Sequence, residues 1–122
     1  MPKIKVVFYK EEDGSVPILE WLDSLQPKAL DKCTVRIERL REVGHELRRP
    51  EADFLQDGIY EIRVGLQHVN YRMLCFFHGR PAAVVSHGSV KEAEVPAKEI
   101  EEAIERKREF EKDPKAHTYE ER

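Results

Sequence analysis

The stretch GIYEIRVGLQHVNYRMLCFFHGRPAAVVSHGSVK, residues 58–91, decides the fold of this chain. Three runs within it are rich in β-branched and aromatic residues and are bounded by turn residues, which is typical of β-strands. The predicted strands are Ile59–Val64, Asn70–Phe77 and Ala82–Val90. Because the turns between them are short, neighbouring strands are expected to pair antiparallel.

Alternation within these strands predicts one apolar face and one basic face. Side chains two positions apart in a strand share a face, so Tyr60, Ile62 and Val64 point one way while Glu61 and Arg63 point the other. The same rule places Arg72 with Asn70, and His87 with Ser89 and Lys91.

If the strands pair in sequence order, four basic or imidazole side chains meet on one face of the sheet: Arg63, Arg72, His87 and Lys91. Paired guanidinium donors suit phosphate oxygens, so the sequence predicts one concave site for an anion, with phosphate as the obvious ligand. This prediction depends on strand register, because a one-residue slip or a bulge would send a side chain to the opposite face.

The first half of the chain predicts one strand and two helices. Lys3–Tyr9 is rich in β-branched and aromatic residues. Ser15 and Pro17 begin a first helix, and Pro27 begins a second one. Apolar residues recur at helical spacing in both, and Gly44 is a suitable end for the second helix.

The remaining segments complete an α+β fold of one domain. Leu47–Asp57 is expected to be a loop or a short edge segment, and Pro96 begins a last amphipathic helix. The domain is expected to span residues 1–112, followed by a polar tail, Asp113–Arg122, that frays or is mobile. The expected architecture is a small, mainly antiparallel sheet with two N-terminal helices on one face and a C-terminal helix.

Composition narrows the functional class. The 122-residue chain has a net charge of −3, whereas a general nucleic-acid binder usually has a basic excess, so any polyanion site must be local. No apolar run could span a membrane and no signal peptide is evident, so a cytoplasmic protein without a membrane partner is expected. The two cysteines, Cys33 and Cys75, fall at apolar positions and are expected to be buried free thiols.

Four segments together resemble the RelE/ParE toxin superfamily, with the HigB-like branch, often described as phage-derived, as the best match. They are GIYEIR (58–63), NYRMLCFF (70–77), VSHGSVK (85–91) and PAKEIEEA (96–103). The resemblance implies a RelE-like fold and the toxin component of a type II toxin–antitoxin system. It further implies a helix-turn-helix antitoxin as partner and cleavage of mRNA on the ribosome, with no metal and no cofactor.

Metal-independent RNA cleavage gives each basic residue a possible role. The ribose 2′-hydroxyl attacks the adjacent phosphorus, so the enzyme must orient the attack, stabilise negative charge and transfer protons. Arg63 and Arg72 suit charge stabilisation, Lys91 adds a point charge, and the pKa range of histidine suits His87 for proton transfer.

Each residue also has a purely structural interpretation. His87 could be a hydrogen-bonded sheet histidine, and Lys91 could be a solubilising charge at the end of a strand. The arginines could form salt bridges, Arg63 with Glu61, Glu92 or Glu94, and Arg72 with Asp57 or Glu61. Some members of the superfamily place a catalytic imidazole or aromatic ring near the C-terminus, so His117 and Tyr119 are further candidates, unless the tail is disordered.

Three functions therefore remain open. The first is a ribosome-dependent mRNA endonuclease. The second is a ParE-type toxin that poisons a topoisomerase by binding alone. The third is a degenerate toxin that retains only antitoxin binding. Glu92 and Ser89 depart from the pattern of many relatives, which have a second lysine and a bulky residue at these positions.

Overall fold

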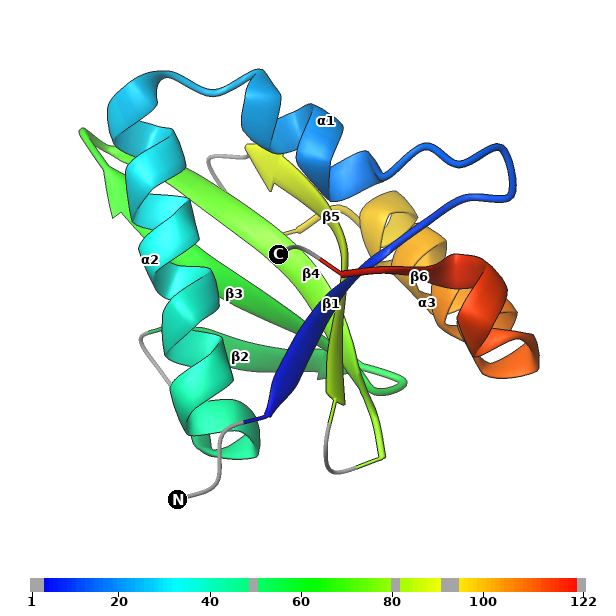
Figure 1. The fold of residues 1–122 in the computed structure, drawn as a ribbon. Helices are drawn as coiled ribbons and strands as arrows, with labels where there is room; N and C mark the ends of the chain where they lie inside the picture. The colour runs from blue at the N-terminus through cyan, green and yellow to red at the C-terminus, as the bar shows by residue number, and fades with distance from the viewer. Residues whose placement is uncertain (1–3, 49–50, 80–81, 91–94, 121–122) are drawn as a thin grey trace.

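The computed structural model describes residues 4–48, 51–79, 82–90 and 95–120 and confirms an α+β fold (Figure 1). Its elements in chain order are β1 (Lys5–Tyr9), α1 (Pro17–Asp23), α2 (Pro27–Val43), a 3-10 turn (Gly44–Glu46), β2 (Ala52–Gln56), β3 (Ile59–Leu66), β4 (Val69–His78), β5 (Ala82–Val90), α3 (Ala97–Lys112), a second 3-10 turn (Pro114–His117) and β6 (Thr118–Tyr119). No helix in these ranges combines the length and the apolar character that a membrane span requires.

The strands form one sheet in the order β2-β3-β4-β5-β1-β6. Strands β2 to β5 are an antiparallel meander, β1 joins parallel to β5, and β6 pairs antiparallel with β1. Two-residue loops set the meander: Asp57–Gly58 and Gln67–His68 have positive φ at both positions, which matches the right-handed twist of hairpin strands. Of the two structures expected for Leu47–Asp57, the short edge strand is present, as β2.

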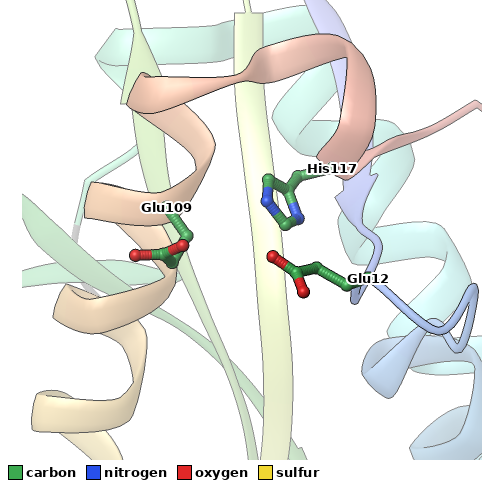
Figure 2. Close-up of side chains that lie close together, drawn as sticks. All are labelled: Glu12, Glu109 and His117. Atoms are coloured by element: carbon green, nitrogen blue, oxygen red, sulfur yellow. The ribbon is translucent and has the colours of Figure 1, made fainter.

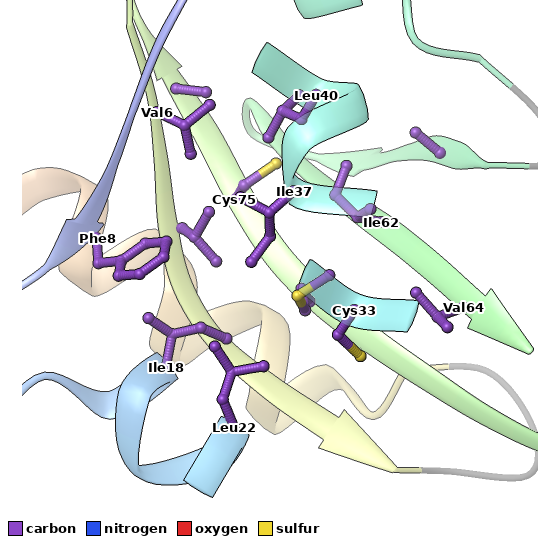
Figure 3. Packing of buried hydrophobic residues seen from close by; sticks show 14 of the residues in the cluster. Val6, Phe8, Ile18, Leu22, Cys33, Ile37, Leu40, Ile62, Val64 and Cys75 are labelled. Carbon is purple, nitrogen blue, oxygen red and sulfur yellow. The ribbon is translucent and has the colours of Figure 1, made fainter. Parts of the chain in front are cut away.

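Each face of the sheet packs against helices. Helices α1 and α2 bury one face, where side chains such as Ile18, Ile37 and Ile62 form the main core (Figure 3). Helix α3 covers part of the opposite face, over a second cluster that includes Leu74 and Phe110. Both faces of β4 are therefore in contact with a helix, which explains the continuous apolar run Met73–Phe77 within it.

Both cysteines lie in the main core as buried free thiols, as expected. Cys33 comes from α2 and Cys75 from β4 (Figure 3). Burial raises the pKa of the Cys33 thiol to about 11 and that of Cys75 to about 12, so both are protonated and unreactive at neutral pH.

The prediction of a frayed or mobile C-terminal tail is wrong for residues 113–120. The Asp113 side chain accepts a hydrogen bond from the Ala116 N–H, and β6 then pairs with the free edge of β1. The ring of His117 stacks on Tyr9 with centroids 5.0 Å apart. These ring contacts and backbone hydrogen bonds give a polar sequence enough interactions to offset the entropy of ordering it.

Gly88 allows α1 to approach the sheet closely. A Cβ atom at this position of β5 would lie 2.1 Å from Cδ2 of Trp21, much closer than any van der Waals contact. Trp21 is partly buried and packs against the main core, so its indole ring occupies the space above the glycine backbone. Only glycine permits this packing of α1 on β5.

We expect Gly88→Ala to destabilise the protein by about 1–3 kcal/mol, the range for overpacking a core, as measured by urea unfolding. Gly65→Ala is the matched control, because a Cβ atom on Gly65 meets nothing within 4 Å. In a Trp21→Ala background the cost of Gly88→Ala should disappear, since the clashing ring is gone. Equal effects at the two glycines would contradict this account.

Candidate functional site

Arg63 and Arg72 lie directly opposite each other in the antiparallel β3–β4 pair. Residues that face each other across such a pair point to the same face of the sheet. Both side chains line a groove of about 410 Å³ on the face covered in part by α3. Its lining residues are Asp53, Phe54, Leu55, Glu61, Arg63, Arg72, Val95 and Ile100. Parity and short turns were sufficient to place the two arginines together.

A buried carboxylate, Glu61, lies between the two guanidinium groups. Its Oε1 accepts a hydrogen bond from Arg63 Nε at 2.6 Å, and its Oε2 lies 3.6 Å from Arg72 Nη1. The second distance is an ion pair but too long for a hydrogen bond. Arg63 also donates through Nη2 to Asp53 Oδ2 at 3.1 Å. The salt bridge to Glu61 that was the alternative interpretation for each arginine is therefore present.

The two arginines differ in how they present their donors to the groove. The Arg63 side chain is 39 % exposed, whereas that of Arg72 is 12 % exposed. A guanidinium has five N–H donors, and Asp53 and Glu61 engage two of those on Arg63. Arg63 thus keeps donors for an incoming anion, while Arg72 is held at the base of the groove.

His87 reaches the same face through a bulge in β5. Leu74 pairs with His87 and Cys75 pairs with Val85, so Ser86 is an extra residue in the ladder. Such a bulge reverses the parity of all later residues in the strand. Ser86 and His87 are consequently both in contact with side chains of α3.

Helix α3 encloses His87 rather than exposing it to the groove. Its Nε2 lies 3.3 Å from Glu99 and 3.6 Å from Glu102, without the alignment of a hydrogen bond, and its Nδ1 is 2.8 Å from Ser86 Oγ. Burial and the Arg106 guanidinium lower the pKa of His87, and the carboxylates of Glu102 and Glu99 oppose this only in part. His87 is therefore neutral at neutral pH.

The predicted site is thus only partly assembled within the described residues. The groove lining includes Arg63 and Arg72 but not His87, which lies on the same face beneath α3. Lys91 lies outside the described residues. His117 and Tyr119 belong to the opposite end of the sheet, where β6 pairs with β1.

Several residues of this region were missed by sequence reasoning. Asp53 comes from the edge strand, and three side chains of α3 surround His87: Glu99, Glu102 and Arg106. Their spacing of three and four residues places these three on one face of a helix, which was a readable signal. The sequence pattern does not predict which part of the sheet these side chains face.

Two groups of described residues have donor atoms close enough to be considered for a metal ion. The first is His87 with Glu99 and Glu102, but Arg106 donates to Glu102 at 3.0 Å and places a fixed positive charge there. This guanidinium makes the group unfavourable for a cation. The second group is Glu12 with Glu109 and His117, and no arginine of the described residues forms an ion pair with either of its carboxylates.

Residues 20–108 match the model of a family described as phage derived protein Gp49-like (DUF891). The chain belongs to this Gp49-like family. It is a RelE/ParE-like toxin family of toxin–antitoxin modules. The matched range contains the groove arginines and His87, so the candidate site lies within the family domain. No curated protein gives a significant match to the chain.

The neutral state of His87 predicts an acid-sensitive Gp49-like fold. Because its folded-state pKa lies below the usual 6.5, the unfolded chain binds more protons, and stability is lost as pH falls from about 6.5 through the folded pKa. The contribution changes by at most about 1.4 kcal/mol per pH unit. Urea unfolding at pH 7.5 and 5.5 should show a smaller pH dependence for His87→Gln than for the natural protein. An identical pH dependence would contradict this assignment.

Proposed function

We propose that this Gp49-like toxin is a ribosome-dependent mRNA endoribonuclease of the HigB-like branch, acting without a metal ion. The observation that supports this proposal most strongly is the pair of guanidinium groups, Arg63 and Arg72, facing each other across β3 and β4 on an open groove. Two such groups at one groove are suited to a phosphodiester, whose non-bridging oxygens accept paired N–H donors.

The proposed reaction is an internal transfer at phosphorus. The 2′-oxygen forms a bond to the adjacent phosphorus while the bond to the 5′-oxygen breaks. The 2′-hydroxyl loses a proton and the leaving oxygen gains one, and the products are a 2′,3′-cyclic phosphate and a 5′-hydroxyl. Arg63 and Arg72 would stabilise the extra negative charge in the transition state.

His87 is the proposed proton acceptor, and its environment sets a condition for that role. A neutral imidazole can accept a proton, but the His87 side chain is only 8 % exposed under α3. The start of α3 would have to move for the 2′-hydroxyl to reach it. Ribosome docking or substrate binding would supply the energy for such a displacement.

The charge of the groove offers a reason for ribosome dependence. The two arginines are matched by the two carboxylates of Asp53 and Glu61. The whole chain has a net charge of −3, so the free protein lacks the basic excess that drives affinity for RNA. We infer that the ribosome must present the mRNA to the groove, since the toxin alone would bind it weakly.

Replacing Arg63 or Arg72 with Ala should lower mRNA cleavage by roughly two to three orders of magnitude, the scale for loss of one transition-state donor. Mapping of RNA ends after induction, or in a reconstituted translation reaction, measures this. Arg108→Ala is the control, because Arg108 is 68 % exposed on α3. Arg63→Lys separates charge from paired donation and should recover part of the activity.

Folding must be checked in parallel, because either Ala substitution leaves Glu61 with one fewer positive partner. His87→Ala should cost about as much as an arginine variant only if His87 transfers a proton. Unchanged cleavage by the double Arg63→Ala, Arg72→Ala variant would contradict the mechanism. Toxicity without RNA cleavage would instead favour a binding-only toxin directed at a topoisomerase, and antitoxin binding without toxicity would favour a degenerate toxin.

Membership of a toxin–antitoxin family implies an antitoxin partner. We propose that it is a helix-turn-helix protein that places a helix or extended segment over the groove of Arg63 and Arg72, or displaces α3. Hydrogen-exchange mapping of the complex should then show protection in β3, β4 and α3. A footprint confined to α1 and α2 would exclude direct occlusion of the groove.

A further inference from the structure

A second polar cluster lies at the far end of the sheet from the groove arginines. His117 comes from the C-terminal 3-10 turn, Glu109 from the last turns of α3, and Glu12 from the loop after β1 (Figure 2). One donor atom from each side chain lies within 4.8 Å of the other two. Three separate parts of the chain therefore converge on one point.

The position of His117 is fixed from several directions. The side chain is buried, with 4 % of the residue exposed, and its ring stacks on Tyr9 at 5.0 Å with an interplanar angle of 6°. Its backbone carbonyl accepts a hydrogen bond from the Lys10 N–H at 2.9 Å. Its Nδ1 lies 2.7 Å from the Lys10 carbonyl oxygen. The ring has little freedom to turn away from the two glutamates.

The contact with Lys10 determines which ring nitrogen carries the proton. A carbonyl oxygen can only accept, so Nδ1 must be the N–H donor. In the neutral ring Nε2 then has a lone pair, and this nitrogen faces the carboxylates of Glu12 and Glu109, which are also acceptors (Figure 2). A backbone hydrogen bond to one imidazole nitrogen is the usual device that orients the other toward a metal ion.

The charge around the cluster is unbalanced in favour of a cation. Among the described residues, no Lys or Arg forms an ion pair with Glu12, and Glu109 pairs only with the exposed Lys112, at 3.2 Å. In contrast to the His87 cluster, no guanidinium of the described residues is bonded to these two carboxylates.

We propose that Glu12, Glu109 and His117 bind a divalent transition-metal ion such as Zn²⁺ or Mn²⁺. One imidazole and two carboxylates are a donor set for such ions, whereas Mg²⁺ and Ca²⁺ prefer oxygen alone. Bonds of about 2.0–2.2 Å place ligand atoms roughly 3.0–3.5 Å apart, so the two flexible glutamates must close by an ångström or more around the ion. The ion is structural and joins the C-terminal turn to the loop after β1 and to α3.

This site is independent of the proposed RNA cleavage. The family resemblance implies a reaction without a metal. The cluster lies beyond β1, whereas the groove arginines are on β3 and β4. A metal ion here would hold the C-terminal segment against the sheet edge, which α3 and the loop after β1 flank. Binding of the ion should therefore raise the thermal stability of the protein and the protection of residues 113–120 against hydrogen exchange.

The test uses the full-length protein, purified without a polyhistidine tag and treated with a chelator. Isothermal titration with ZnCl₂ and MnCl₂ should give one ion per chain, and MgCl₂ should give no comparable binding. At a hundredfold excess of free ion over its Kd, the melting temperature should rise on the order of 10 °C. Co²⁺ should give a visible absorption band in the natural protein, as expected for a site with nitrogen and oxygen ligands.

Matched variants locate the ion. Glu12→Gln and Glu109→Gln keep the side-chain shape but remove the charge, so each should weaken binding at least tenfold without lowering the melting temperature of the metal-free protein. Glu105→Gln is the control, since Glu105 is exposed on the same helix and pairs with Arg108. Unchanged affinity in both glutamine variants would overturn the proposal, and so would loss of binding in Glu102→Gln, which would place the ion beside His87. If acidification stabilises the protein but none of the metal ions does, the cluster holds a proton instead of a metal ion. That result would also overturn the proposal.

Discussion

The burial of the Glu61 carboxylate between two guanidinium groups is the constraint on which the site and much of the sheet depend. A charge with 2 % exposure costs several kcal/mol unless it is paired, and here the partners come from two different strands. Arg63 lies on β3 with Glu61, while Arg72 lies opposite on β4. A slip of one residue between β3 and β4 would leave the carboxylate buried without Arg72. Electrostatics therefore reinforces the register that the apolar pattern already favours.

This arrangement links stability to the proposed chemistry. The same guanidinium groups that offer donors to the groove also neutralise Glu61, so a substitution for activity is also a substitution in a buried ion network. Arg72 is more deeply enclosed, whereas Arg63 is more exposed and better placed to meet an anion. The structural and the functional interpretation of these arginines are therefore compatible, because the same guanidinium groups can serve both roles.

Much of the fold could be predicted from the sequence because it is locally encoded. Period-two alternation located β3, β4 and β5, and helical spacing located α1, α2 and α3. The Asp57–Gly58 pair, a strong hairpin signal, would have identified β2 as a full partner of β3. The C-terminal segment could not be recognised from composition, because its order depends on ring stacking and backbone contacts with β1.

Only the part of the candidate site that follows from the alternation of side chains along a strand could be predicted. Arg63 and Arg72 flank one short turn, so their common face follows from counting residues. The position of His87 depends on the extra residue Ser86 in the ladder. Gly88 in VVSHGSV signals a bulge or a close backbone approach, but it does not show which residue of the strand is the extra one. The residues that set the charge state of His87 come from α3, which no local rule assigns to that part of the sheet.

The same side of the sheet thus holds two imidazoles, His87 and His117, each beside a pair of carboxylates. The two groups differ in charge because a guanidinium is bonded to a carboxylate in only one of them. Arg106 bonds to Glu102 and Glu11 and approaches Ser86, so its positive charge offsets the acids near His87 and favours the neutral ring. No guanidinium of the described residues engages Glu12 or Glu109. The negative charge of these two carboxylates, which His117 faces, is therefore not neutralised by an arginine. Helix α3 carries Glu99, Glu102, Arg106 and Glu109 at spacings of three and four residues, so they lie on one face. This face can therefore support a neutral proton acceptor at one end and attract a cation at the other.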